Sequence, residues 1–168
     1  MSHVVEVDQS GKIEDTATAT VLAFADGVDY AIVISSKVKR DCLAVMRVGN
    51  QLGKTMYLQL FSAALYLLLK NHLLALGRII IDQEYVMRER DIKRFLVNLI
   101  RKDFPTFDTQ IIQFDRIGKS STAPDRAIAT LRGKIKPDRK ITAEELLGLV
   151  RGFQTEATKK DRGLLKSR

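Results

Sequence analysis

The sequence has 168 residues, 45% of them hydrophobic, and a formal net charge of +8. This length supplies apolar material for one ordinary core and is too short for two full domains. The single cysteine, Cys42, excludes an intramolecular disulfide and a multi-thiolate metal site, which is typical of a reducing compartment. No apolar run approaches the roughly 18 residues of a membrane span, and residues 1–6 are too polar for a signal peptide. We therefore expect a cytoplasmic protein without membrane contact, whose positive charge attracts an anionic partner.

The first third of the chain predicts three β-strands joined as an antiparallel meander. The strands are expected at residues 3–8, 17–25 and 30–36, where β-branched residues are frequent or alternate with small ones. Residues 8–12 supply turn chemistry after the first strand. The Asp-Gly pair at residues 26–27 is favoured in tight hairpins because glycine tolerates a positive φ.

The middle of the chain predicts a buried helix followed by a buried strand. Residues 55–76 are apolar at almost every position, which is typical of a helix buried on most of its circumference. Gly77 is expected to end this helix as a C-cap, and residues 78–82 predict a strand with Asp82 at its exit. A helix that returns the chain to the sheet suggests that this strand pairs in parallel with an earlier one.

The next segment predicts a second helix, a strand and a closing helix. Residues 88–103 have the cleanest amphipathic pattern, and residues 109–115 alternate as a half-buried strand. Ser121 or Thr122 is expected to cap a helix that has Pro124 in its first turn. The inward side chains of that helix are expected to be Ala127, Ile128 and Leu131.

Residues 134–168 are expected to form a basic appendage to a main domain at residues 1–133. This appendage carries ten lysines and arginines against five acids, a net charge of +5. Thr142 and Glu145 have the spacing of a capping box and predict a short helix that runs to about Arg151. The remaining tail is polar and basic, so it can be either a solvated tail or an arm that contacts nucleic acid.

The order of these elements resembles that of the ribonuclease H-like superfamily over residues 4–132, with acids at the ends of the first and fourth strands. The resemblance implies a three-layer α/β fold with a mixed five-stranded sheet, in the order β-β-β-α-β-α-β-α, followed here by a short C-terminal helix. In that fold the fourth strand lies parallel to the first, so Asp8 and Asp82 would meet. The chain is closer to the resolvase-like branch, because residues 42–81 contain no acid to match the first-helix glutamate of ribonuclease H.

Enzymes of this superfamily cleave or join nucleic-acid phosphodiesters with two divalent cations. Such cations need hard oxygen ligands, which carboxylates provide. The resemblance assigns Asp8, Asp82 and Asp125 to catalysis and metal binding, and places Glu84 close behind as a further ligand. It thus implies a hydrolase, a nuclease that uses Mg²⁺ or Mn²⁺ to cleave DNA or RNA.

Each acid also has a structural explanation. Asp8 can initiate the turn that follows it, and Asp125 lies where any helix N-terminus favours a negative charge. Asp82 can be a strand-end acid that faces solvent, but an acid that closes a buried isoleucine-rich strand is costly without a partner, which favours a functional role. Because the first-helix acid is missing, the alternative is a non-catalytic module of the same fold that binds nucleic acid or a protein partner.

Several polar residues outside the acids are candidate contacts to nucleic-acid phosphates, and solvated loops are the alternative. They are Lys37, Lys39, Arg40, Lys54, Lys119, Ser120 and Arg126. Residues 49–55 resemble a phosphate-binding P-loop, but three residues separate the glycines where a P-loop has four, so nucleotide hydrolysis is a weaker hypothesis. The apolar helix at residues 55–76 could also provide the face of a homodimer. Its tyrosines, Tyr57 and Tyr66, are expected in the core rather than as platforms for bases.

Overall fold

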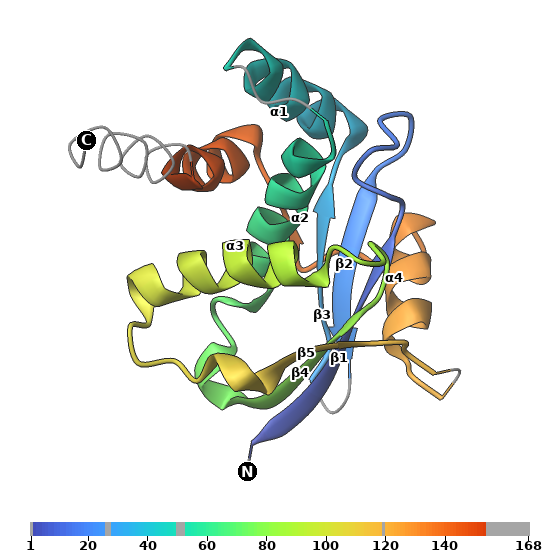
Figure 1. Ribbon diagram of the computed structural model, residues 1–168. Coiled ribbons are helices and arrows are strands. Elements are labelled where there is room, and N and C mark those ends of the chain that lie inside the picture. Colours follow the sequence, from blue (N-terminus) through green and yellow to red (C-terminus); the bar gives the residue numbers. More distant parts are fainter. Residues whose placement is uncertain (1, 26–27, 50–52, 119, 154–168) are drawn as a thin grey trace, which may run out of the picture.

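The computed structural model describes residues 2–25, 28–49, 53–118 and 120–153. The chain forms a mixed six-stranded sheet with helices on both faces, a three-layer α/β arrangement (Figure 1). The strands are β1 (His3–Ser10), β2 (Thr20–Ala25), β3 (Tyr30–Ile34), β4 (Leu76–Asp82), β5 (Ile112–Asp115) and β6 (Arg139–Lys140). Their order across the sheet is β5-β4-β1-β2-β3-β6. The first three strands are antiparallel neighbours, while β4 is parallel to both β1 and β5, and β6 is parallel to β3.

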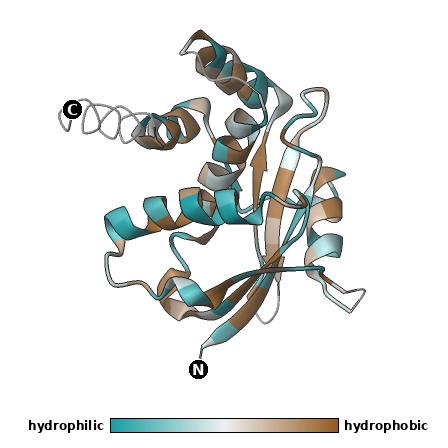
Figure 2. Cartoon of the chain, viewed as in Figure 1, coloured by the Kyte–Doolittle hydropathy of each residue, from teal (hydrophilic) through white to brown (hydrophobic). Residues whose placement is uncertain are grey.

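The helices divide unequally between the two faces of the sheet. They are α1 (Ser36–Val48), α2 (Lys54–Leu69), α3 (Glu89–Asp103), α4 (Ala123–Leu131) and a C-terminal helix at residues 143–153. On one face, α1, α2, α3 and the C-terminal helix share a large hydrophobic core with the strands. On the other face, α4 packs on a small cluster that includes Ala23 and Ala127. In Figure 2 the hydrophilic colour covers most of the visible face of α3, as expected of an amphipathic helix at the surface.

Helix α2 lies at the centre of the large core. Every residue from Met56 to Leu69 except Tyr57 is buried, which confirms the expectation from its apolar sequence. The hydroxyl of Ser62 lies 2.7 Å from the carbonyl oxygen of Leu58 and 3.4 Å from that of Ile92, on α3. The helix is covered within the chain itself, so it does not offer the exposed apolar face expected of a dimer contact. No helix in the described ranges is long and apolar enough to span a membrane.

Three elements differ from the sequence expectation. Helix α1 was not expected, because its buried stripe contains a lysine beside Cys42, Leu43 and Met46 and is therefore hard to recognise as apolar. Gly77 does not cap a helix: α2 ends at Leu69 and Gly77 lies within β4, where a Cβ atom would come within 2.4 Å of the Ser2 Cβ. The sheet has six strands instead of five because β6, in the expected linker, pairs with β3.

Two elements in the second half of the chain, β5 and α4, also differ in detail from the sequence expectation. Only Ile112–Asp115 of the expected strand pairs in the sheet, because residues 109–111 form a 3₁₀ turn. On α4, Ala127 is buried as expected, but Ile128 is 40% exposed. The helix is short and lies on a sheet face of small side chains, so only a narrow stripe of it is covered.

The C-terminal helix begins with the expected capping box. The backbone N–H of Thr142 donates to the Glu145 carboxylate over 2.9 Å, and the backbone N–H of Glu145 donates to the Thr142 hydroxyl over 3.2 Å. This reciprocal pair satisfies two N–H groups that a helix start leaves without partners. Leu146, Val150 and Phe153 are buried in the same core as the sheet. Residues 154–168, the expected basic tail, lie outside the described part of the chain.

Lys39 of α1 is fully buried and holds the loop between β1 and β2. Its ammonium donates to the Lys12 carbonyl over 3.0 Å, to the Thr20 hydroxyl over 3.1 Å and to the Asp15 carbonyl. Burial lowers the Lys39 pKa, and the nearby Asp15 and Glu14 oppose that shift. The three donors of the ammonium all have partners within the chain. This burial replaces the expected nucleic-acid contact of Lys39 with a structural role.

Replacing Lys39 with methionine is expected to lower the free energy of unfolding by about 3 kcal/mol, because three buried oxygens lose their donor. Lys37→Met is the matched control. Lys37 lies on the same helix, its side chain is 78% exposed and it forms an exposed ion pair with Asp41 over 2.7 Å, so the expected change is within about 0.5 kcal/mol. Urea unfolding of both variants measures the difference. Equal effects would contradict a clamping role for Lys39.

Candidate acidic site

Two carboxylates meet where β1 and β4 run side by side. The parallel register pairs Val7 with Ile81, so the next residue on each strand is an aspartate, Asp8 or Asp82. Val7 and Ile81 both belong to the large core. Because successive side chains on a strand point to opposite faces, the two aspartates lie together on the other face, the one that α4 covers. The expectation that Asp8 and Asp82 are neighbours is confirmed.

Glu84 completes a cluster of three acids. One carboxylate oxygen from each of Asp8, Asp82 and Glu84 lies within 4.8 Å of the other two. The chain turns sharply after β4, and the N–H of Glu84 donates to the Asp82 carbonyl over 2.9 Å, which returns the Glu84 side chain toward the strand end. One oxygen of the Asp82 carboxylate accepts from the Ile117 N–H over 2.9 Å. That bond ties the cluster to the segment between β5 and α4.

The cluster is electrostatically costly without a cation. Asp8 is only 8% exposed, and burial raises its pKa from 3.8 to about 7, with further increases from the charges of Asp82 and Glu84. A hydrogen bond from the backbone of Gln9 opposes this shift. Burial also raises the pKa of Glu84, and the charge of Asp82 raises it further. Carboxylates held together against their mutual repulsion form a site that favours a cation.

The structure does not place Asp125 in this cluster. Asp125 lies in the first turn of α4 and is exposed. It is not among the acids whose oxygens approach one another within 4.8 Å in the described part of the chain. Asp41, on the unexpected helix α1, is exposed and pairs with Lys37 over 2.7 Å. The acids that come together are therefore Asp8, Asp82 and Glu84.

The expected phosphate contacts are scattered. Arg126 is an internal tie, because its side chain is 13% exposed and forms an ion pair with Asp138 over 3.1 Å. Arg40 donates to the Thr16 carbonyl over 3.0 Å. Lys54 and Ser120 are exposed. Lys119 lies outside the described residues.

A polar network behind the cluster was not expected from the sequence. Gln9 follows Asp8 and is also 8% exposed, and its side-chain amide donates to the Gly11 carbonyl over 3.1 Å and approaches the Tyr85 hydroxyl at 3.4 Å. The Tyr85 hydroxyl donates to the Glu14 carboxylate over 3.1 Å. The only available signal was alternation along β1, which places Gln9 on the core face. The side-chain oxygen of Gln9 is buried and has no hydrogen-bond partner among the described residues.

The remaining motifs have structural roles. The segment at residues 49–55 joins two helices, α1 and α2, whereas a P-loop follows a strand; its residues 50–52 lie outside the described ranges. Cys42 is buried and burial raises its pKa to about 11, which disfavours the thiolate. His72 packs against the rings of Phe24 and Tyr30 at centroid distances of 5.1 and 4.6 Å.

Asp8→Asn is expected to stabilise the metal-free chain at about pH 8 and to raise its Tm by roughly 2 to 6 °C. Between pH 3.8 and about 7 the folded chain retains a proton on Asp8 that the unfolded chain releases, so the stability of the wild type falls as pH rises. Asparagine carries no charge and avoids this loss. Thermal unfolding in EDTA at about pH 3.5 and 8 measures the effect, and a stabilisation of equal size at both pH values would contradict it.

The acid cluster is the most chemically distinctive arrangement among the described residues, since it combines burial, mutual repulsion and hard oxygen ligands. Comparison with models of protein families, with curated proteins and with solved structures found no match to this chain. The functional argument therefore rests on the geometry of the strand ends and on the chemistry of three carboxylates.

Proposed function

We propose that this chain is a ribonuclease H-like, divalent-metal-dependent nuclease that cleaves nucleic-acid phosphodiesters. The observation that carries the proposal is the convergence of Asp8, Asp82 and Glu84, with one oxygen of each within 4.8 Å of the others. The parallel pairing of β4 with β1 supports the proposal, because the resemblance implies that the fourth strand lies parallel to the first. The net charge of +8 is also in keeping with a polyanionic substrate.

The donor set fits Mg²⁺ or Mn²⁺. Both ions prefer oxygen ligands, and all three members of the cluster are carboxylates. A bound cation would also offset the burial and the mutual repulsion that raise the pKa values of Asp8 and Glu84. When bound, such ions lower the pKa of water and stabilise the charge that develops on the phosphoryl oxygens.

The side chains of the cluster would hold and orient the ions. The bond from the Ile117 N–H occupies one oxygen of Asp82 and orients that carboxylate. Asp8 lies on β1, which pairs with β2 on one side and with β4 on the other. Glu84 lies just beyond the end of β4. Two ligands on paired strands and a third from the turn that follows suit a metal site, which needs ligands on well-supported elements.

Asp82→Asn is expected to abolish metal-dependent cleavage and to weaken Mn²⁺ binding by at least about tenfold, because a charged ligand is replaced by a neutral one. Asp115→Asn is the matched control. Asp115 ends the neighbouring strand and pairs with Asp82 in register, yet it lies outside the cluster. Labelled DNA, RNA, hybrid and branched substrates with Mg²⁺ or Mn²⁺ test cleavage, and calorimetry tests binding. Metal-dependent cleavage that survives Asp82→Asn would contradict the assignment.

A second candidate is a non-catalytic module of the same fold that binds nucleic acid or a protein partner. The observation that favours it is the position of Asp41 and Asp125: both are exposed, and neither α1 nor α4 contributes a described acid to the cluster. Nucleic-acid binding by the wild type without metal binding or cleavage would support this module and exclude the nuclease.

A further inference from the structure

A cavity of about 320 Å³ lies on the α2 side of the sheet, whereas Asp8 and Asp82 lie on the α4 side. Its wall comes from three segments: the loop after β1, the first turns of α2, and the connection between β4 and α3. This volume is at the lower end of the range of small-molecule sites, which suits a single nucleotide-sized group.

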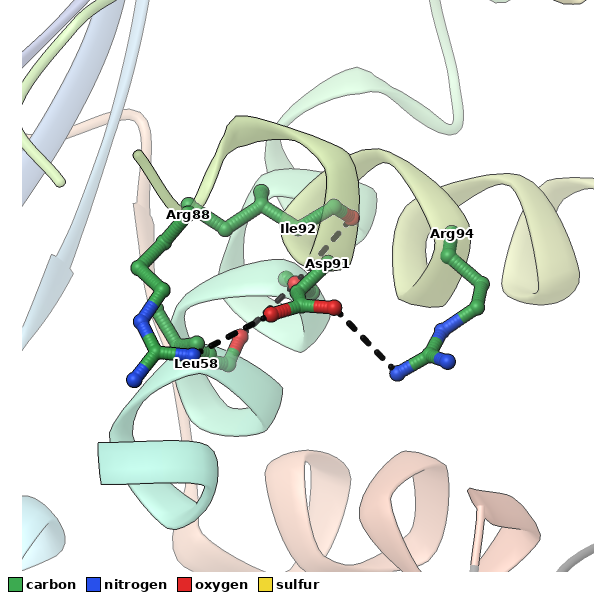
Figure 3. A network of polar contacts seen from close by, with 6 residues as sticks. Leu58, Arg88, Asp91, Ile92 and Arg94 are labelled. Atoms are coloured by element: carbon green, nitrogen blue, oxygen red, sulfur yellow. Dashed lines mark hydrogen bonds and ion pairs between the residues drawn. The ribbon is translucent and has the colours of Figure 1, made fainter. Parts of the chain in front are cut away.

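Two cationic side chains, Lys54 and Arg88, line the cavity. Lys54 is the first residue of α2, and its side chain has no hydrogen bond or ion pair with any residue that the structure describes. The positive end of the α2 dipole adds to its charge. Arg88 forms an ion pair with Asp91 over 3.5 Å, and Figure 3 shows Arg88 and Arg94 on either side of that carboxylate. Arg88 uses one guanidinium nitrogen in this pair, so further N–H groups remain for a ligand.

Aromatic and apolar groups form the rest of the wall. Tyr57 is the one residue between Met56 and Leu69 of α2 that is not buried, and it lines the cavity together with Tyr85. The Tyr85 ring is held against Phe61 at a centroid distance of 4.9 Å. Aromatic walls beside cationic groups are the combination that binds a base together with its phosphate.

Consecutive residues of the chain belong to the acid cluster and to the cavity wall. Glu84 belongs to the cluster and Tyr85, the next residue, lines the cavity. Glu14 also lines the cavity and accepts a hydrogen bond from the Tyr85 hydroxyl over 3.1 Å. With Glu14 included, the charged side chains of the cavity sum to +1, opposite in sign to the acid cluster. A phosphate can therefore be held in the cavity without a metal ion, whereas the cluster repels it.

We propose that this cavity binds one nucleotide of a single-stranded segment that flanks the cleaved phosphodiester. Lys54 and Arg88 contact its phosphate and the tyrosine wall contacts its base or sugar. The substrate class in this inference rests on the proposed nuclease function, but binding in the cavity needs no metal. A strand that crosses the end of β4 would reach both the cavity and the acid cluster.

The test measures binding of short fluorescein-labelled single-stranded DNA and RNA by fluorescence anisotropy in EDTA at several salt concentrations. Lys54→Gln and Arg88→Gln are each expected to raise the Kd about three- to tenfold and to lower the salt slope by about one. Arg94→Gln is the matched control, because Arg94 pairs with the same Asp91 and is not part of the cavity wall. It is expected to leave the Kd unchanged.

Equal losses in all three variants, or no loss in any of them, would overturn the inference, as would the absence of binding by the wild type. If AMP displaced the probe with an affinity equal to that of the probe itself, the proposal of a single-stranded ligand would be wrong. The cavity would then be assigned to a free nucleotide. Asp82→Asn separates the two proposals: it is expected to bind the probe normally in EDTA while cleavage with Mg²⁺ or Mn²⁺ is lost. A wild type that never cleaves but shows the Lys54 and Arg88 effects would refute only the nuclease.

Discussion

The parallel pairing of β1 with β4 is the constraint on which the candidate site depends. It sets Val7 beside Ile81, and the residues that follow are both aspartates. A shift of one residue in this register would exchange the two faces of one strand and would place its aspartate in the apolar core. The valines and isoleucines of the two strands bury in the large core and oppose such a shift. Hydrophobic burial on one face of the sheet thus holds two like charges together on the other.

The remaining parts of the site follow from how the chain leaves these strands. After β4 it turns at once and brings Glu84 back to the strand end. After β1 it enters a loop that the buried Lys39 holds by its carbonyl oxygens and by Thr20. That loop carries Glu14, which Tyr85 contacts from the segment after β4. The segments that leave these two strands therefore contribute side chains to the acid cluster and to the cavity, which α2 completes, and the charged side chains of the two differ in net sign.

Much of this arrangement could be predicted from the sequence, because it follows from local patterns. The apolar run of α2, the amphipathic pattern of α3 and the capping box at Thr142 each determine their element through short-range physics. The adjacency of Asp8 and Asp82 was expected from the resemblance, which implies that the fourth strand lies parallel to the first; in the structure Asp82 ends β4, while β1 continues past Asp8 to Ser10.

The parts that could not be predicted depend on contacts between distant segments. Lys39 was expected at the surface, because nothing local indicates that three oxygens from residues 12–20 surround it. The two residues of β6 pair with β3 across more than a hundred positions. The resemblance assigned Asp125 to catalysis and Glu84 only to metal binding, whereas the turn after β4 brings Glu84 to the cluster and Asp125 lies exposed in the first turn of α4.

The most direct measurement of the central claim is anomalous diffraction from crystals of the chain soaked in Mn²⁺. The account predicts an anomalous peak bounded by the carboxylates of Asp8, Asp82 and Glu84, which disappears in crystals of Asp82→Asn. A wild-type crystal with manganese bound elsewhere and no peak between these carboxylates would contradict it.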